Sequence, residues 1–360
     1  HNPPWGCRFF TIGRHYLHVV TGCGRSDGGG YLHHDLGFHG YCRDSQGDIA
    51  VPASVGRRST GVMEAVIDVV QAVPAPEDRR WLPLQIGHGL ANSHEDIARN
   101  IQSALDRHLR RYMEVVGTEK GTVSIVGSGP SLKRNWRNIE KLGGDIIACN
   151  AAYQFLLEKG ITPKYMMCFD ADPLMLEFIT PHPEIVFLIA SRCPPKAFDM
   201  LADCDVVCWH AAGDRDTESL LQKAGRFDDP MVIGGTSATM RGMLIAQTLG
   251  YTDVHLWGAD ASFENGETHI RKSTTNEKRM FINMAGRVFE TAPWMTQQVN
   301  DFKLLAPALR DFYGVTLTVH GDGLLPQAAA SMGFRVDWPL ATRQFFRQWK
   351  WNAVNLWQTI

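Results

Sequence analysis

The stretch Val123-Ser-Ile-Val-Gly-Ser-Gly-Pro-Ser-Leu-Lys133 decides the fold class of this chain. An apolar, strand-like run leads directly into a glycine turn and then into the start of a helix. Glycines permit positive φ and the close approach of a ligand, proline suits the first helical turn, and amides freed there bind anions. The alternative is a turn that serves only tight packing. We predict a phosphate or nucleotide site built from Gly127, Ser128, Gly129, Pro130 and Ser131, with positive charge from Lys133 or Arg134.

Between Gly121 and about Leu325, short β-rich runs alternate with amphipathic segments. This alternation is typical of βαβ units, so we predict an α/β, Rossmann-like domain with a mainly parallel sheet and helices on both faces. The expected strands are 123–126, 146–149, 165–169, 185–189, 206–209, 254–257 and 315–319. The clearest expected helices are 153–157, 174–178, 219–224, 237–249 and 295–313, and a hairpin is expected around Ala285-Gly286.

We divide the chain into three parts. Residues 1–92 are rich in Gly and His, and their short aromatic runs suggest a small β-rich region or a loosely ordered extension of unknown role. Residues 93–335 form the Rossmann-like domain, which begins with a helix behind Ser93. Residues 336–360 form an aromatic and basic tail with a helix. Its Phe345, Trp349 and Trp357 suggest docking on the domain, a contact between subunits of a homo-oligomer, or contact with a membrane surface.

Composition excludes several classes of protein. Lys and Arg number 36 against 38 Asp and Glu, so the formal charge of −2 gives no general attraction to nucleic acid. The longest apolar runs are far shorter than the roughly 18 residues of a membrane span. Eight cysteines in 360 residues are too few for a disulfide scaffold. The first residues also lack the pattern of a signal peptide, so we expect a cytoplasmic protein.

Asp170 and Asp172 follow the strand expected at 165–169. Their two-residue spacing points both carboxylates the same way if the chain stays extended, at the edge where open α/β sheets bind ligands. Two carboxylates beside a nucleotide suggest Mg²⁺, a cation that prefers oxygen ligands. We therefore predict a Mg²⁺ site at Asp170 and Asp172 and a catalytic role for Asp170. The alternative for Asp172 is a helix cap.

A second glycine turn, Ile233-Gly-Gly-Thr-Ser237, opens the helix expected to end at Leu249. Amides and hydroxyls of Gly234, Gly235 and Thr236 are predicted to add to the nucleotide site. The alternative is that the hydroxyls of Thr236 and Ser237 only cap the helix.

Asp260 and His269 share a loop after the strand expected at 254–257. An acid and a histidine on one loop suit general acid/base catalysis, so we predict catalytic roles for both, although an ordinary solvated histidine is the alternative for His269. His210 and His320 also follow strand ends, where burial and turn formation are the alternatives to catalysis. A metal cluster of His33, His34, His39 and Cys42 lacks the usual spacing of metal ligands.

Several short motifs together resemble the MptE-like family, which is named for a 6-hydroxymethyl-7,8-dihydropterin diphosphokinase. They are Val126-Gly-Ser-Gly-Pro-Ser-Leu132, Cys149-Asn150-Ala-Ala, Gly160-Ile-Thr-Pro-Lys164, Phe169-Asp-Ala-Asp-Pro173 and Leu256-Trp-Gly-Ala-Asp260. The likeness covers about Gly121 to Gly323, and Trp209-His210 with Val319-His-Gly-Asp-Gly323 looks like members carried by phages and prophages. The glycine turn and the following Cys-Asn also resemble bacterial lipooligosaccharide sialyltransferases and motility accessory factors, which use nucleotide-activated sugars.

These resemblances imply a Rossmann-like transferase. They place the glycine turn at a nucleotide phosphate, Asn150 beside the nucleotide, and Asp170 near metal or substrate. The favoured hypothesis is Mg²⁺-assisted transfer of diphosphate from ATP to a hydroxymethyl group on a pterin-like ring. A glycosyltransferase that uses a nucleotide sugar is the second hypothesis, although no tyrosine pair typical of the sialyltransferases is evident. The third hypothesis is a non-catalytic nucleotide-binding or assembly protein.

Overall fold

The computed structural model describes residues 92–270, 278–340 and 342–344, together with the backbone of three short strands near the N-terminus. Two of these, β1 (Arg8–Ile12) and β2 (His15–Val19), pair antiparallel within a compact unit of residues 1–67. The third, β3 (Ala72–Val73), belongs to the second unit, residues 68–360. The N-terminal histidine cluster and the aromatic side chains of the tail, Phe345, Trp349 and Trp357, lie outside the described residues.

A ten-stranded sheet, in which every pairing is parallel, forms the centre of the second unit. Its order is β10-β9-β8-β7-β6-β5-β11-β14-β15, and β4 pairs with β9 off this path. The prediction of an α/β, Rossmann-like fold is confirmed. The strands are β4 (Arg110–Arg111), β5 (Thr122–Val126), β6 (Asp145–Cys149), β7 (Tyr165–Cys168), β8 (Val186–Ala190), β9 (Asp205–Ala211), β10 (Met231–Val232), β11 (Asp253–Trp257), β14 (Thr316–His320) and β15 (Arg335–Asp337).

Strand order reverses at β5. From β5 the chain steps outward to β10, and it then returns to place β11 on the other side of β5. In doubly wound sheets, ligands bind in the crevice outside the carboxyl ends of the strands near such a reversal. The turn after β5 and the loop after β11 therefore meet where a site is expected.

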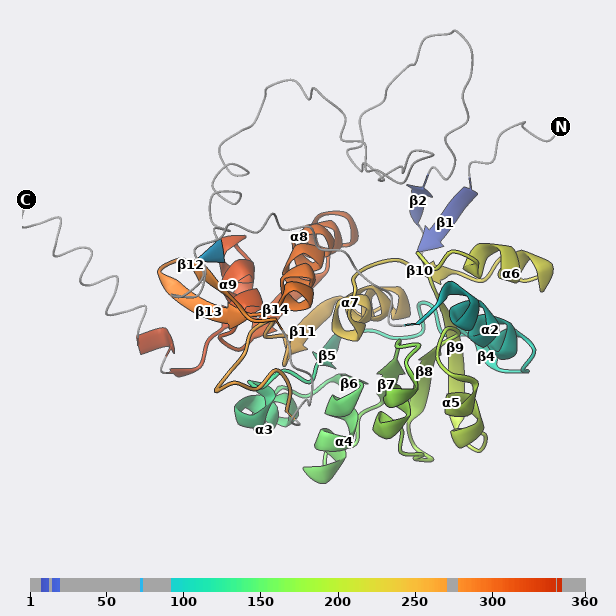
Figure 1. Ribbon diagram of the computed structural model, residues 1–360, viewed down its shortest axis with the longest axis horizontal. Coiled ribbons are helices and arrows are strands. Elements are labelled where there is room, and N and C mark those ends of the chain that lie inside the picture. Colours follow the sequence, from blue (N-terminus) through green and yellow to red (C-terminus); the bar gives the residue numbers. More distant parts are fainter. Residues whose placement is uncertain are drawn as a thin grey trace, which may run out of the picture. The chain divides into compact units, whose positions relative to one another are not determined.

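Helices cover both faces of the sheet. Figure 1 shows α3, α4 and α5 on one side and α7, α8 and α9 on the other. The side chain of Ser93 caps α2 by accepting from the amide of Asp96 at 3.1 Å, as the sequence predicts. The helices are α2 (His94–Leu105), α3 (Leu132–Leu142), α4 (Ala151–Glu158), α5 (Pro195–Met200), α6 (Thr217–Lys223), α7 (Ala238–Leu249), α8 (Pro293–Tyr313) and α9 (Leu324–Ser331), with 3₁₀ turns η1 (Tyr112–Glu114) and η2 (Pro173–Phe178).

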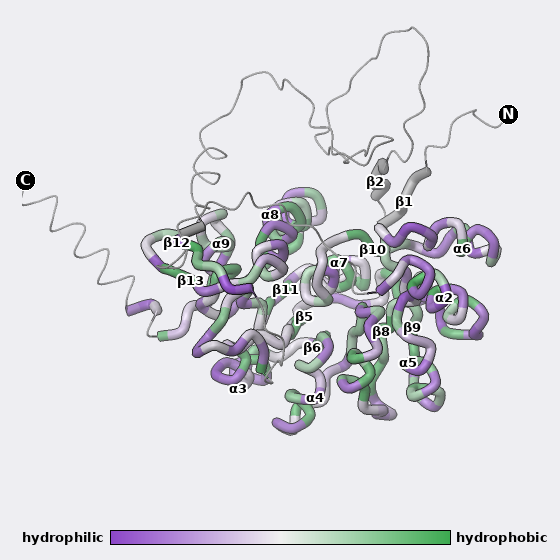
Figure 2. Tube along the Cα trace, in the orientation of Figure 1, coloured by the Kyte–Doolittle hydropathy of each residue, from purple (hydrophilic) through white to green (hydrophobic). Residues whose placement is uncertain are grey.

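The core lies between the sheet and these helices. Figure 2 shows β8 and β9 as largely hydrophobic and α6 as largely hydrophilic. Large aromatic side chains such as Tyr153, Phe187, Trp209 and Trp257 are buried in one continuous cluster. Each buried side chain of this size contributes roughly 2–3 kcal/mol through its apolar surface. The strands of a parallel sheet are covered on both faces, which explains their nearly continuous apolar sequences.

The predicted hairpin is confirmed. β12 (Met280–Met284) pairs antiparallel with β13 (Arg287–Thr291), and β3 joins β12 as a third strand. The two turn residues, Ala285 and Gly286, have φ of 52° and 75°. Positive φ at both central residues is the geometry of the two-residue turn that suits the twist of a hairpin.

Candidate functional site

A cavity of about 650 Å³ lies at the carboxyl edge of the sheet. We call it the main cavity. Residues that follow β5, β6, β7, β8, β9 and β10 line it, together with α7, His269 and the first turns of α8. Small-molecule sites have volumes of about 300–1,000 Å³ and occur at this edge of α/β sheets. The main cavity therefore has the size and the place of a ligand site.

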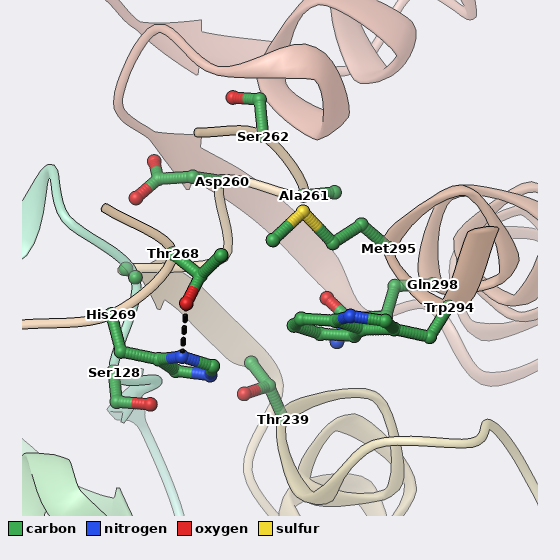
Figure 3. Close-up of a pocket in the computed structure, with 12 residues that line it drawn as sticks. Ser128, Thr239, Asp260, Ala261, Ser262, Thr268, His269, Trp294, Met295 and Gln298 are labelled. Carbon is green, nitrogen blue, oxygen red and sulfur yellow. Dashed lines mark hydrogen bonds between the residues drawn. The ribbon is translucent and has the colours of Figure 1, made fainter. Parts of the chain in front are cut away.

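A smaller cavity of about 50 Å³ adjoins it and is lined by residues from the turn after β5, the loop after β11 and α8. We call it the side cavity. Figure 3 shows His269 and Trp294 on its wall, and both residues also line the main cavity. Their rings lie nearly parallel, with centroids 5.7 Å apart. The two cavities thus share an aromatic wall.

Three of the four backbone N–H groups of the first glycine turn are not free, although the sequence predicts free amides there. The N–H groups of Gly127 and Gly129 donate to the carbonyl oxygens of Trp257 and Gly258, both at 2.8 Å. The N–H of Ser131 donates to Oδ2 of Asp260 at 2.8 Å. These three amides already donate to acceptors of the protein itself, so they are not free to hold a phosphate in this structure. A carboxylate of the chain itself fills the anion position at the start of α3.

Close packing explains the two glycines of this turn. A Cβ on Gly127 would lie 2.7 Å from the carbonyl oxygen of Gly258, and one on Gly129 would lie 2.6 Å from the same oxygen. Both distances are far below van der Waals contact. The packing alternative therefore accounts for Gly127 and Gly129, whereas Ser128, between them, lines both cavities.

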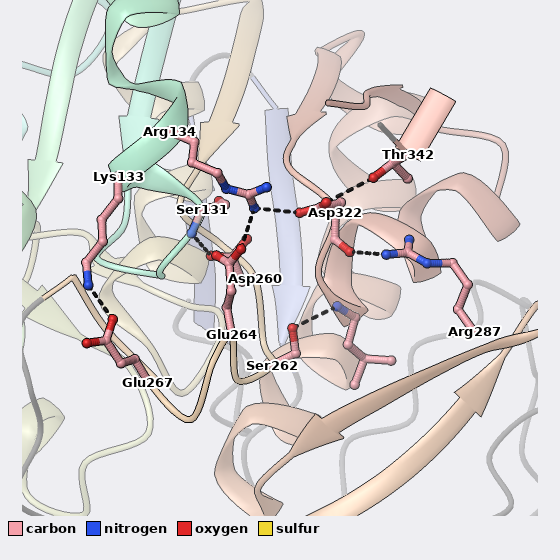
Figure 4. A network of polar contacts seen from close by, with 11 residues as sticks. Ser131, Lys133, Arg134, Asp260, Ser262, Glu264, Glu267, Arg287, Asp322 and Thr342 are labelled. Atoms are coloured by element: carbon pink, nitrogen blue, oxygen red, sulfur yellow. Dashed lines mark hydrogen bonds and ion pairs between the residues drawn. The ribbon is translucent and has the colours of Figure 1, made fainter. Parts of the chain in front are cut away.

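Asp260 is buried and holds the turn rather than facing the main cavity. Figure 4 shows its carboxyl group directed at Ser131. Its second oxygen, Oδ1, is also buried and has no hydrogen-bond partner among the described residues. Burial raises the pKa of Asp260 to about 6. Hydrogen bonds from Ser131 lower the pKa, but their effect is smaller than that of burial. The structure therefore favours a positioning role for Asp260 over the predicted catalytic one.

Ion pairs connect α3 to the loop after β11 and to the turn after β14. Arg134 pairs with Glu264 at 3.1 Å and with Asp322 at 2.9 Å, and Lys133 pairs with Glu267 (Figure 4). These contacts place the predicted cations Lys133 and Arg134 outside the main cavity. They hold in position the loop that carries His269.

A carboxylate also fills the second glycine turn. The amide and the hydroxyl of Thr236 donate to Oδ2 of Asp301 at 2.6 and 2.8 Å. The hydroxyl of Ser237 accepts from the amide of Met240 at 3.3 Å and caps α7, as the alternative interpretation expects. Gly234, Gly235 and Thr236 line the main cavity, but the amide of Thr236 is not free for a ligand.

Two arginines on the cavity wall were not anticipated. The guanidinium carbons of Arg192, after β8, and Arg241, in α7, lie 4.7 and 4.3 Å from the ring centroid of Phe169. Arg192 pairs with Asp214 at 2.9 Å. Arg241 donates to the carbonyl oxygens of Val232 and Ala212 at 2.7 and 3.2 Å. Burial lowers the pKa of Arg241 to about 10, so its positive charge is poorly solvated.

Sequence features point to both arginines in retrospect. Arg192 follows a buried strand closely, at the edge where parallel sheets bind ligands. Arg241 is the only charged residue in α7, whose other residues are almost all buried. A buried charge in an apolar helix is unusual enough to indicate a functional role.

Asn150 is held in an unusual backbone conformation at the end of β6, with φ 50° and ψ −126°. Its side-chain Oδ1 is buried and has no partner among the described residues, and the residue lines the main cavity. Strained backbone and an unpaired polar atom are typical of binding sites. Both observations are consistent with the prediction that Asn150 lies beside a ligand.

Asp170 and Asp172 have different surroundings and do not form a pair of carboxylates in the main cavity. Asp170 is exposed and lines the main cavity, where its Oδ1 accepts from the amide of Asp172 at 3.2 Å. Asp172 accepts from the amide of Leu174 at 2.9 Å and caps η2, which confirms the capping alternative. Within the described part of the chain, no group of three or more acidic, His or Cys side chains is arranged to hold a metal ion. A Mg²⁺ ion could be held here by Asp170 together with water and oxygens of the substrate.

The three candidate histidines have different surroundings. His269 lies on the wall of both cavities, and its Nδ1 is 2.8 Å from the hydroxyl of Thr268. His320 is buried against Trp257 and hydrogen-bonded to His255 at 2.8 Å. Burial and the charge of His255 lower the pKa of His320 to about 4. His210 is buried beside Ser191 and Asp229, so only His269 remains a candidate for catalysis.

The MptE-like family, described as 6-hydroxymethylpterin diphosphokinase MptE-like, matches residues 95–266. This span contains both glycine turns, Asp170, both cavity arginines and Asp260. The match supports a transferase-like domain. No curated protein matches the chain. Nothing in these comparisons supports a phage origin.

Among solved structures, the chain is similar to the MAf glycosyltransferase of Magnetospirillum magneticum AMB-1, with 17% identity and a TM-score of 0.50. The similarity covers 71% of this chain and 39% of that one, so this chain spans about two fifths of that protein. It shows a shared fold. A mammalian sialyltransferase in complex with Gal-beta-1-3GalNAc-ortho-nitrophenol is similar at 10% identity and a TM-score of 0.34, over 63% of this chain and 79% of that one. No helix in the described parts of this chain has the length and apolar character of a membrane span.

Proposed function

We propose that this chain is a nucleotide-dependent transferase whose nucleotide binds in the main cavity. One observation carries the proposal: a cavity of ligand size lies at the strand-order reversal, and most of its lining residues, including two arginines, fall in the region that matches the MptE-like family. The family match favours ATP as the nucleotide and diphosphate as the transferred group, with a pterin-like acceptor.

The proposed reaction forms one bond and breaks one. The hydroxymethyl oxygen of the acceptor attacks the β-phosphorus of ATP, the bond from that phosphorus to the α,β-bridging oxygen breaks, and AMP leaves. The acceptor proton must pass to a base. His269 is the candidate base, because it is the one histidine of the three that lines both cavities.

Other residues of the cavity would bind and position the substrates. Ser128 and Asn150 offer a hydroxyl and an unpaired amide oxygen to the nucleotide. Asp170 would hold Mg²⁺, which neutralises phosphate charge when it is bound. Trp294 offers an aromatic face to a planar acceptor at the junction of the two cavities.

The test is a nucleotide panel followed by an activity assay. Binding of ATP, CMP, UDP and GDP with and without Mg²⁺ is measured by thermal shift, since a ligand that binds the folded state raises its Tm. Incubation with ATP, Mg²⁺ and 6-hydroxymethylpterin should then release AMP and form a diphosphorylated product. Absence of both products, with ATP bound, would exclude diphosphate transfer to this acceptor.

Glycosyl transfer from a nucleotide sugar is the second candidate. The buried Oδ1 of Asn150 supports this candidate, because it has no partner among the described residues and can accept a hydrogen bond from a sugar hydroxyl. A preference for CMP, UDP or GDP over ATP in the same panel would support it. A non-catalytic role remains the third candidate, and binding of a nucleotide without any product from ATP or from a nucleotide sugar would support that role.

A further inference from the structure

We propose that the phosphates of the nucleotide bind at Arg192, with Arg241 as a second positive charge behind Phe169, and not at either glycine turn. This inference rests on the proposed function, because it assigns the anion-binding residues of the same cavity. Neither arginine belongs to a glycine motif.

The first argument is that both glycine turns already hold an anion. Asp260 accepts from the amide of Ser131, and Asp301 accepts from the amide and hydroxyl of Thr236. A phosphate at either turn would have to displace a carboxylate that the fold holds in place. Displacement would leave the buried carboxylate of Asp260 without the amide of Ser131, which costs several kcal/mol, and it would leave Asp301 with Gln297 as its donor.

The second argument is the local charge around Phe169. Two guanidinium groups lie against this ring, and Asp214 is the one carboxylate within ion-pair distance of either among the described residues. The side chains of Arg192 and Asp214 are only 12% and 7% exposed. The cluster of Arg192, Arg241 and Asp214 therefore has two positive charges and one negative charge, and it lies in the wall of the main cavity. An anionic ligand would balance that charge.

The other two carboxylates of the main cavity lie beyond ion-pair distance of both guanidinium groups in the described part of the chain, although the charge of Asp301 opposes the lowering of the pKa of Arg241. Asp301 uses Oδ2 for Thr236 and Oδ1 for the side-chain amide of Gln297 at 3.0 Å. Asp170 is exposed, and its Oδ1 accepts from the backbone. A Mg²⁺ ion that bridges to a phosphate needs an accessible carboxylate nearby. The exposed carboxylate of Asp170 could serve as that ligand.

The two arginines have different parts in the proposed site. Both terminal nitrogens of Arg241 already donate to carbonyl oxygens, so this residue contributes charge rather than a direct contact. Arg192 pairs through Nη1 alone, and its Nη2 has no partner in the described part of the chain. Asp214 and Phe169 fix the guanidinium in advance, which reduces the entropy lost when a phosphate binds.

The test measures the affinities of ATP and of inorganic pyrophosphate by titration calorimetry. Arg192→Gln should weaken both by about ten- to a hundredfold, since a hydrogen bond between charged groups contributes about 1.5–3 kcal/mol. The matched control is Arg215→Gln, because Arg215 follows β9, is exposed and lines neither cavity. If Arg192→Gln does not fold, Arg192→Lys keeps the charge without the planar fork and should give a smaller loss of both affinities.

Each outcome separates the two proposals. If Arg192→Gln folds and binds ATP and pyrophosphate as the wild type does, the phosphate assignment is wrong while nucleotide binding stands. Pyrophosphate binding that depends on Arg192, without binding of any nucleotide, would keep the anion site and remove the proposed function. Failure of the wild type to bind either ligand would overturn both.

Discussion

Asp260 fastens the first glycine turn through a charged hydrogen bond to the amide of Ser131. Carboxylates are stabilising near the start of a helix, which is where this one lies, before α3. Burial nevertheless raises its pKa to about 6. The folded protein therefore takes up a proton at Asp260 at a higher pH than the unfolded chain does.

This shift predicts a pH dependence of the free energy of unfolding. The protonated form of Asp260 stabilises the folded state relative to the ionised form. This contribution to the free energy of unfolding is fully present below the ordinary pKa of 3.8 and is lost as the pH rises through about 6. Asp260→Asn should remove this dependence, because Asn is uncharged and its side-chain oxygen can still accept from Ser131. Relative to the wild type, the variant should gain up to about 3 kcal/mol between pH 4 and pH 7.

Urea unfolding at several pH values measures this difference. Asp203→Asn, which changes an exposed carboxylate, is the control and should track the wild type. A constant difference between Asp260→Asn and the wild type across the whole range would contradict the raised pKa.

Gly129 is the position where the turn tolerates least change. An added Cβ would lie 2.6 Å from the carbonyl oxygen of Gly258, which is backbone and cannot move easily. Gly129→Ala should therefore lower the free energy of unfolding by roughly 2–3 kcal/mol through overpacking. Gly160→Ala provides the comparison, because nothing lies within 4 Å of its Cβ position and only its positive φ, 76°, opposes alanine.

Chemical denaturation of both variants gives the two losses. Gly160→Ala should cost about 1 kcal/mol, the usual cost of positive φ for a residue with a side chain. Equal losses for the two variants would mean that contact with Gly258 does not explain the glycine at 129.

Individual residues show how far sequence reasoning about the site could go. The sequence placed Ser128, Asn150, Asp170 and His269 at a ligand edge, and the structure brings all four to the main cavity. It could not show that Asp260 and Asp301 occupy the turns. Asp260 lies 129 residues from Ser131 along the chain, and Asp301 lies 65 residues from Thr236. No local sequence pattern predicts hydrogen bonds over such separations.

At the scale of elements, strong local patterns were sufficient. All seven expected strands exist, because buried parallel strands are short apolar runs between turns. Short elements were not anticipated: α5 has six residues, and the edge strands β10 and β15 have two and three. Elements of this length depend on tertiary pairing more than on their own sequence. α9 was also missed, because six of its eight residues are small or apolar and its two polar residues, Gln327 and Ser331, do not make the polar face that would reveal a helical period.

The hairpin of β12 and β13 supplies a test at the same scale. Ala285 occupies the first turn position with φ 52°, where Asn is the preferred residue in this kind of turn. Ala285→Asn should raise the free energy of unfolding by about 0.5–1 kcal/mol, because it relieves the cost of a left-handed alanine.

Thermal or urea denaturation detects a change of this size. Ala308→Asn, in the middle of α8, is the matched control and should lower stability, since Asn is a poorer helix former than Ala. Loss of stability in Ala285→Asn would contradict the turn geometry described above.

At the scale of the whole second unit, the site is a product of topology. Side chains that follow six strands meet at the carboxyl edge because the sheet is parallel and reverses its order at β5. The sequence predicted the edge from the strand ends. It could not predict that charge would come from Arg192 and Arg241, because Arg192 reaches Phe169 from the loop after β8 and Arg241 reaches it through the packing of α7 against the sheet.

The most direct test is a crystal structure of the protein with a non-hydrolysable ATP analogue and Mg²⁺. The expected result is a nucleotide in the main cavity, with a phosphate oxygen within hydrogen-bond distance of the guanidinium of Arg192 and with Asp260 still bound to the amide of Ser131. A phosphate seated on the amides of residues 127–131, with Asp260 displaced, or a nucleotide bound outside the main cavity, would contradict the account.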